Sequence, residues 1–286
     1  MSSRLTYHVA IVSDTPSLSF KHVAPVAAAL QKQVSRDFGP LWGVNATVDA
    51  FDTLEDVPVD YWPVIIRDDI NDPEAAGYHT DDHGQPFSLV QFDSGWGLTV
   101  SHETLEMLAD PFGSRTIAGS PPPQAPKPVS NFSRVLYLVE VCDPCEETKF
   151  AYTSNGVRVS DFITPHYYDP DEGPGTRYSF RGHVKAPHTV LEGGYVSFGN
   201  PVTNHWYQII VQNGKVQLED LGVIKSSKGK SLREMVDNIV RGRRVKERYR
   251  LKPAAATAAA ATSGIPFAET SEARAKSLRE YVKGLK

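Results

Sequence analysis

The sequence predicts an α+β fold in which a mixed sheet carries packed helices and is followed by β-rich segments and C-terminal helices. Three observations support this prediction. Residues 6 to 110 follow the order strand, helix, three strands and helix; short β-type runs continue from residue 133; and two helical segments close the chain. With 286 residues, 40% of them hydrophobic, the chain is also long enough to bury a sizeable core.

In the first half of the chain, polar and apolar residues alternate over 6–13 up to a turn, and this pattern predicts a strand. Apolar residues then recur at helical spacing from Val23 to Val34, with Pro25 suited to the first turn. Gly39 and Pro40 are expected to stop this helix. Further strands are expected at 45–51, 62–67 and 87–92, with the segment GYHTDDHGQP at 77–86 as a turn-rich loop.

In the second half, the Pro-rich stretch at 120–131 predicts an extended, mobile connection. Strand-type residues follow at 133–141, 148–163, 186–199 and 205–219, and a helix is expected over about 230–248.

We expect three parts: an α+β domain at 1–252 with a β-rich C-terminal part, an Ala/Thr-rich linker at 253–269 and an amphipathic tail helix at 270–286. Leu278, Tyr281, Val282 and Leu285 share one face of the tail helix. That face needs a partner, either the body of the protein or another chain, so self-association through the tail is one expectation.

Composition narrows the functional classes. The N-terminal apolar run is too short for a signal peptide, and no stretch approaches the length of a transmembrane helix. Two cysteines are too few for a secreted disulfide framework. We therefore expect a cytoplasmic protein with no membrane partner.

Charge is unevenly distributed although the formal net charge is only -4. Between Asp49 and Asp82, Arg67 is the only Lys or Arg among many acids, whereas 225–252 is rich in Arg and Lys. The basic helix has arginines on several faces and few interleaved aromatic residues. Nucleic acid is therefore an unlikely partner, and a solvated helix packed on its own domain is the simpler interpretation.

The most informative segment is TVSHETLEMLADP at 99–111, which predicts a short helix. At 3.6 residues per turn, His102, Glu103, Glu106 and Asp110 point to about 0°, 100°, 40° and 80° around the axis. Leu105 and Leu108 lie on the opposite half, where a core requires them. The simpler interpretation of the polar side is the ordinary polar face of an amphipathic helix.

A His followed four residues later by a second ligand, with Glu beside the first, is the arrangement that zinc peptidases use. Here Glu106 stands where those enzymes have His. His102 and Glu106 are predicted to hold a divalent metal, with Glu103 offset as the general base that polarises a bound water. Zinc is the expected ion, and two carboxylates would shift the preference toward Mn²⁺ or Ca²⁺.

A third ligand must come from elsewhere, because Asp110 lies at the helix end. Glu140 or Asp143, in the strand-to-turn sequence LVEVCDPCE, is the expected source. His79 and His83 in the preceding loop are weaker candidates.

The element order that ends in an edge strand followed by SHETLE resembles the catalytic half of zincin-like metallopeptidases. Together with VEVCDPCE and VSDFITP, it also resembles an uncharacterised bacterial and phage family with an SHExLExLxDP box. The resemblance covers roughly residues 5–165. It implies a metal held by His102 and Glu106, with Glu103 as base if the site is active.

Other motifs point to packing rather than chemistry. Cys142 and Cys145 have CxxC spacing, but the acids that follow would raise a thiol pKa, so buried thiols in a turn are expected. Tyr167 or Tyr168 is an alternative oxyanion donor in an aromatic segment that more often packs a loop. The sequence contains no GxSxG, P-loop or GxGxxG element.

Two functions remain open. The first is a zincin-like metal-binding protein, a candidate metal-dependent hydrolase of peptide or protein substrates. The second is a non-catalytic structural or assembly protein that docks through its C-terminal helix. An open coordination position beside Glu103 and a cleft beside the edge strand would favour the enzyme.

Overall fold

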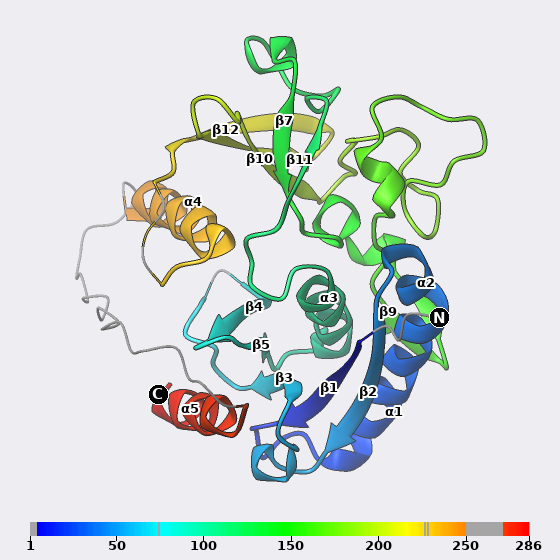
Figure 1. The fold of residues 1–286 in the computed structure, drawn as a ribbon, viewed down its shortest axis with the longest axis vertical. Coiled ribbons are helices and arrows are strands. Elements are labelled where there is room, and N and C mark those ends of the chain that lie inside the picture. Colours follow the sequence, from blue (N-terminus) through cyan, green and yellow to red (C-terminus); the bar gives the residue numbers. More distant parts are fainter. Residues whose placement is uncertain (1–4, 74, 226, 228, 250–270, 286) are drawn as a thin grey trace.

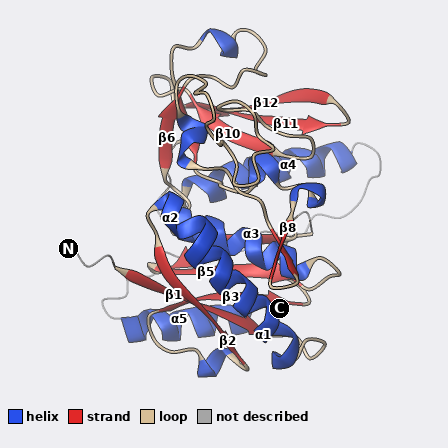
Figure 2. Cartoon of the chain, turned by 90° about the vertical axis from the view of Figure 1, so that its right-hand side faces the viewer, coloured by secondary structure: helices blue, strands red, loops and turns tan. Residues whose placement is uncertain are grey.

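The computed structural model describes residues 5–73, 75–225, 227, 229–249 and 271–285, with the backbone alone described over 242–249. Two five-stranded sheets lie one above the other, and helix α3 (Trp96–Ala109) runs between them (Figures 1 and 2). The predicted combination of helices with a mixed sheet is confirmed. The predicted linker at 253–269 lies outside the described residues.

The first sheet, here called sheet A, has the strand order β2-β1-β3-β5-β4. Its members are β1 (Thr6–Ser13), β2 (Asn45–Phe51), β3 (Tyr61–Arg67), β4 (Gly77–Asp82) and β5 (Gln85–Gln91). All pairings are parallel except that of β4 with β5. The central strands carry continuous apolar runs that are fully buried, as expected of parallel strands covered on both faces.

The prediction for β4 was wrong, because the segment at 77–82 is a strand and not a loop. Only His83 and Gly84 form the turn, and both have positive φ (52° and 82°), which suits a tight hairpin. The polar turn-type residues before them belong to the edge strand. As a consequence β4, and not the strand predicted at 87–92, forms the edge of sheet A.

The first helical region is longer than predicted. It runs through α1 (Phe20–Lys32), a π-helical segment (Gln33–Phe38) and α2 (Gly39–Trp42). Pro25 lies inside α1, and Gly39 and Pro40 do not stop the helix. Pro40 lies in the first turn of α2, where a missing N–H is tolerated, and Gly43 with φ 70° ends the helix instead.

The second sheet, sheet B, is antiparallel with the order β12-β11-β10-β7-β6. Its members are β6 (Thr116–Gly119), β7 (Val135–Leu138), β10 (Tyr195–Gly199), β11 (His205–Gln212) and β12 (Lys215–Val223). A separate small hairpin pairs β8 (Tyr152–Ser154) with β9 (Val157–Val159). Strand β6 was not predicted. Strands β7, β8, β9 and β10 are shorter than the predicted runs, whereas β11 and β12 together extend past the predicted end at 219 to Val223.

Strand β7 ends early because the chain leaves the sheet to reach α3. The predicted strand 133–141 therefore ends at Leu138, and the segment 139–142 continues toward the helix. The backbone N–H of Ile163 donates to the carbonyl of Val141 at 2.7 Å, and the N–H of Cys142 donates to the Glu106 carboxylate at 3.2 Å. This departure from the sheet brings Glu140 and Asp143 to the polar side of α3.

The Pro-rich connection at 120–131 is tied to the body of the protein. The side chain of Gln124 donates to the carbonyl of Val190 and accepts from its N–H, both at 2.8 Å. Val129 is buried in a 3₁₀ turn (Val129–Asn131). The segment is therefore not the simply extended connection that was predicted.

Two C-terminal helices cover the sheets. Helix α4 (Leu232–Tyr249) packs Val236 and Val240 against Leu138 and Trp206 of sheet B. Helix α5 (Ser271–Gly284) lies on the outer face of sheet A (Figure 1), where Leu278 and Val282 are buried beside Ile65, Phe87 and Leu89. Arg67 donates to the carbonyls of Val282 and Leu285 at the end of α5. The apolar face of the tail helix is thus covered by its own chain.

Among the helices that the structure describes, none combines the length and apolarity needed to cross a membrane.

Candidate metal centre

Helix α3 supplies the centre of the site. It begins at Trp96, three residues before the predicted start, and ends at Ala109, since Pro111 restricts Asp110. Arg115 closes the C-terminal end: its backbone N–H donates to the Asp110 carboxylate and its guanidinium donates to the carbonyl of Ala109, at 2.7 and 2.8 Å. Asp110 therefore caps the helix and belongs to neither of the metal-like groups found among the described residues.

The polar side of α3 is buried. Glu103 and Glu106 are 3% and 0% exposed, and Leu105 and Leu108 are buried on the other side as predicted. The helix is covered on its polar side by the segment that follows β7 and by Arg233 from α4. The simpler interpretation, an ordinary solvent-facing polar stripe, is therefore wrong for these two glutamates.

A first group of side chains joins His102, Glu106 and Asp143. The Nε2 atom of His102 lies 3.3 Å from Oε1 of Glu106 and 3.0 Å from Oδ1 of Asp143. One ligand atom from each residue lies within 4.8 Å of the others, so the group is close enough to hold a metal ion. The His102 side chain is 14% exposed, whereas the two carboxylates are at most 1% exposed, so the group meets solvent beside His102.

A second group joins His79, Glu103 and Glu106 and also has metal-ligand spacing. The Nδ1 atom of His79 lies 3.5 Å from Oε2 of Glu103 and 3.8 Å from Oε2 of Glu106. The two groups share Glu106, which turns one carboxylate oxygen toward each of them.

Arg233 of α4 reaches into the second group. Its Nη1 atom lies 3.2 Å from Oε2 of Glu106 and 3.6 Å from Oε2 of Glu103, and it contacts Nδ1 of His79. Its Nε atom lies 3.0 Å from Oε1 of Glu140. The guanidinium is thus surrounded by three glutamates and one histidine.

The remaining predicted residues fall outside the first group. Glu140 contacts Arg233 and belongs to neither metal-like group, and Glu103 lies with His79 rather than with His102 and Asp143. His83 contacts Asp82 at the hairpin turn. Of the two proposed sources of a third ligand, the structure brings Asp143 to His102 and Glu106.

Several buried carboxylate oxygens in this cluster accept no well-aligned hydrogen bond from the described residues. They are both oxygens of Asp143 and one oxygen each of Glu103, Glu106 and Glu140. Buried polar atoms without a donor are costly, and most buried polar groups in native proteins have a partner. The cluster therefore has unused acceptor capacity of the kind that a cation satisfies.

The pKa values of the cluster are shifted in the directions expected for several carboxyl groups buried close together. Burial and the charge of Asp143 raise the pKa of Glu140 well above its ordinary value, and they raise that of Glu146 to about 8. Burial would raise the pKa of Glu106 as well, but His102 and Arg233 outweigh it and hold that pKa at about 2. Burial lowers the pKa of His102, yet the neighbouring Glu106 and Asp143 together raise it well above 6.5.

The CxxC motif contributes thiols that are buried and unpaired. Cys142 and Cys145 are free and at most 1% exposed, and burial raises the pKa of both thiols well above 9. Neither is a reactive thiolate near neutral pH. Cys142 contacts the site through its backbone N–H, which donates a hydrogen bond to the Glu106 carboxylate and orients it.

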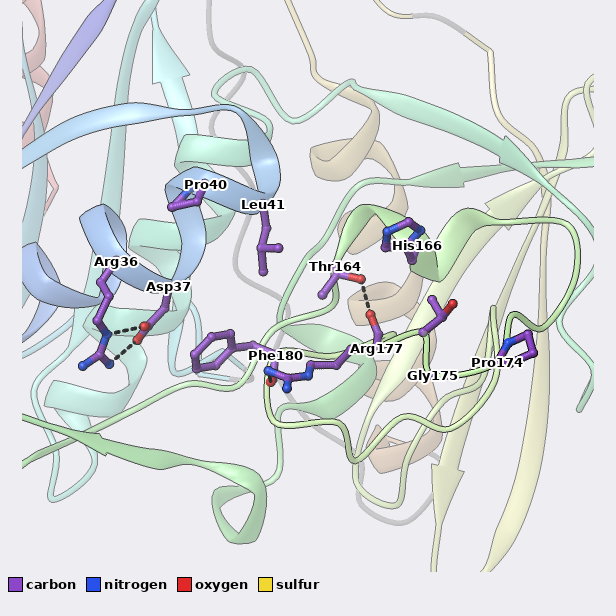
Figure 3. A pocket seen from close by; sticks show the side chains of 11 residues that line it. Arg36, Asp37, Pro40, Leu41, Thr164, His166, Pro174, Gly175, Arg177 and Phe180 are labelled. Atoms are coloured by element: carbon purple, nitrogen blue, oxygen red, sulfur yellow. Dashed lines mark hydrogen bonds and ion pairs between the residues drawn. The ribbon is translucent and has the colours of Figure 1, made fainter.

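A cavity of about 460 Å³ lies apart from the cluster, between the α1–α2 region and the loop around Thr164 (Figure 3). None of the cluster residues lines it. Two arginines line this cavity, and each donates a hydrogen bond to another lining residue. Arg36 donates to the Asp37 carboxylate, and Arg177 donates to the carbonyl of Phe180. Tyr167 is fully buried and Tyr168 nearly so, and neither lines this cavity.

No protein-family model matches the chain, and neither a curated protein nor a solved structure matches it significantly. The chemistry of the cluster is therefore the basis for any functional conclusion.

Proposed function

We propose that this chain is a zincin-like metal-binding protein that holds one divalent ion with His102, Glu106 and Asp143. The observation that carries the proposal is a buried group of one imidazole and two carboxylates whose ligand atoms lie 3.0 and 3.3 Å from the histidine nitrogen. Ligands about 2.0–2.2 Å from one zinc ion at tetrahedral angles lie roughly 3.3 Å apart.

The donor set fits several divalent ions. One imidazole and two carboxylates are ordinary ligands of zinc and also suit manganese, whereas calcium prefers oxygen ligands alone. Zinc is the ion that the zincin resemblance implies, so we propose zinc first and manganese second. An ion here would also satisfy the buried oxygens of Asp143, which accept no well-aligned hydrogen bond from the described residues.

We propose metal-dependent hydrolysis, with peptide or protein substrates, as the activity of this centre. Three protein ligands leave a fourth position of a tetrahedral ion for water, and the partly exposed His102 marks the side from which water can enter. The element order strand, helix, four strands and α3, with an antiparallel edge strand, supports the zincin-like proposal. Glu103 is the base that the resemblance implies, but its carboxylate lies on the Arg233 side of Glu106.

A second candidate, a non-catalytic protein that keeps the ion for stability, is favoured by the burial of the cluster and by the position of the described cavity elsewhere. Docking of a partner through the tail helix receives less support, because α5 already buries Leu278 and Val282 against sheet A.

Metal content tests the proposal. The full chain, purified and reconstituted with zinc, is expected to contain one equivalent of zinc by elemental analysis. The His102→Ala and Asp143→Ala variants should contain less than about a tenth of that. The matched control is His166→Ala, which removes an exposed histidine paired with Asp169. No zinc or manganese in the reconstituted wild type, or equal metal in all four proteins, contradicts the proposal.

A cleavage assay on the same proteins distinguishes a hydrolase from a structural metal-binding protein. Incubation with a peptide library should yield cleavage products with the wild type and the His166→Ala control but not with Asp143→Ala. Stoichiometric metal without cleavage, together with a large rise in melting temperature on metal binding, would assign the ion a structural role.

A further inference from the structure

Glu106 has two oxygens that serve different cations, and only one of these cations is proposed to be a metal. Oε1 faces His102 and Oε2 faces Arg233. A carboxylate that bridges two cations in this way is typical of two-metal sites, in which the ions lie about 3.5–4 Å apart. The cluster thus has the plan of a two-cation centre.

We propose that Arg233 takes the place of a second metal ion, so that its guanidinium is the fixed second cation of a centre bridged by Glu106. This inference rests on the proposed metal at the first group. Its basis is that Nη1 lies against all three ligand atoms of the second group: 3.2 Å from Glu106, 3.6 Å from Glu103 and in contact with Nδ1 of His79.

The histidine distinguishes this arrangement from an ordinary Arg–Glu network. An arginine can only donate hydrogen bonds, so a hydrogen bond from Arg233 to His79 requires the His79 tautomer that has its lone pair on Nδ1. That is the form in which an imidazole binds a metal. The second group therefore presents to Arg233 the same donor atoms that it would present to a divalent ion.

Burial and charge explain why a cation is required at this position. His79, Glu103, Glu106 and Glu140 are each at most 5% exposed. Oε2 of Glu103, Oε2 of Glu106 and Oε1 of Glu140 accept no well-aligned hydrogen bond, and each lies within 3.6 Å of an Arg233 nitrogen. The guanidinium supplies one positive charge without Lewis acidity, so it offsets part of the carboxylates' charge and leaves the first group as the centre of this cluster that can activate water.

The first test is metal stoichiometry with Mn²⁺ as the probe, using the full chain. Wild type is expected to bind one equivalent, and Arg233→Ala, which removes the fixed cation and leaves space, is expected to bind two. Two bridged Mn²⁺ ions are magnetically coupled, so the electron paramagnetic resonance spectrum of Arg233→Ala should lose intensity per ion. The His79→Ala/Arg233→Ala double variant should return to one equivalent.

Two further variants serve as controls. Arg233→Lys keeps a positive charge and should remain at one equivalent. Arg241→Ala, which removes the next arginine on the same face of α4, should also remain at one.

The outcomes are distinguishable. One equivalent in both wild type and a folded Arg233→Ala protein overturns this inference and leaves the proposed function intact, and two equivalents in wild type overturn it as well. No bound Mn²⁺ in wild type overturns the proposed function and this inference with it. If Arg233→Ala unfolds without metal, refolding with two equivalents but not with one supports the inference, and failure to refold at saturating Mn²⁺ overturns it.

Discussion

The two sides of Glu106 are built from similar residues but are completed differently. On one side His102 and Asp143 face a partly exposed position, and the Asp143 oxygens accept no well-aligned hydrogen bond from the described residues. On the other side His79 and Glu103 meet a buried guanidinium. The comparison teaches that an excess of buried carboxylates can be balanced in two ways, by an arginine of the same chain or by an ion from solution.

The largest effect is expected on the arginine side. In metal-free protein, Arg233→Met should lower the free energy of unfolding by about 3–5 kcal/mol, because it leaves buried carboxylates without their counter-charge. Arg241→Met is the comparison variant: Arg241 is about a third exposed and pairs with the buried Asp72, so its loss should cost less than that of Arg233, about 1–3 kcal/mol. Urea denaturation measures both. Equal losses would show that Arg233 has no special place in the cluster.

The next effect separates the two glutamates of α3. Glu106→Gln removes a ligand of the first group and should weaken zinc binding at least about 100-fold. Glu103→Gln changes only the second group and should alter zinc affinity by less than about tenfold. Competition with a chromogenic chelator measures both affinities. A similar loss in the two variants would mean that Glu103 is itself a ligand and would remove the distinction between the groups.

A smaller effect concerns pH in the metal-free protein. The pKa values of His102, Glu140 and Glu146 are raised in the folded state, so the folded protein binds more protons than the unfolded chain. The glutamates therefore lose their contribution to stability as pH rises above about 4.5, and His102 loses its own above about 6.5.

Metal-free protein should accordingly melt at a lower temperature at pH 8 than at pH 5, by roughly 5 °C or more. Zinc-loaded protein should show a smaller difference, because the ion replaces the protons. Differential scanning calorimetry in the presence and absence of chelator measures this. A metal-free melting temperature that rises from pH 5 to pH 8 would mean that the cluster does not hold extra protons.

The sequence predicted one side of the centre better than the other for a physical reason. His102 and Glu106 lie one helical turn apart, so spacing alone places them together, and Asp143 stands where an apolar run gives way to a turn. His79 and Arg233 meet across 154 residues of sequence. Arg233 also lies on a helix with many arginines, where nothing local separates a buried arginine from a solvated one.

The fold, like the metal centre, was predicted well in some parts and poorly in others. The parallel strands of sheet A correspond closely to their predicted ranges, because each is a short alternating or apolar run bounded by turn residues. Strand β4 was missed because its polar residues resemble a loop, although they form an edge strand that pairs along one side only. In sheet B the departure of residues 139–142 toward α3 shortened β7, and such a departure depends on contacts distant in sequence.

The most direct test of the central claim is a crystal structure of the zinc-loaded protein with anomalous data collected at the zinc absorption edge. The account predicts a single peak about 2.0–2.2 Å from the ligand atoms of His102, Glu106 and Asp143, with Arg233 still against Glu103 and His79. A peak between His79 and Glu103 with Arg233 displaced, or no peak in the cluster, would contradict it.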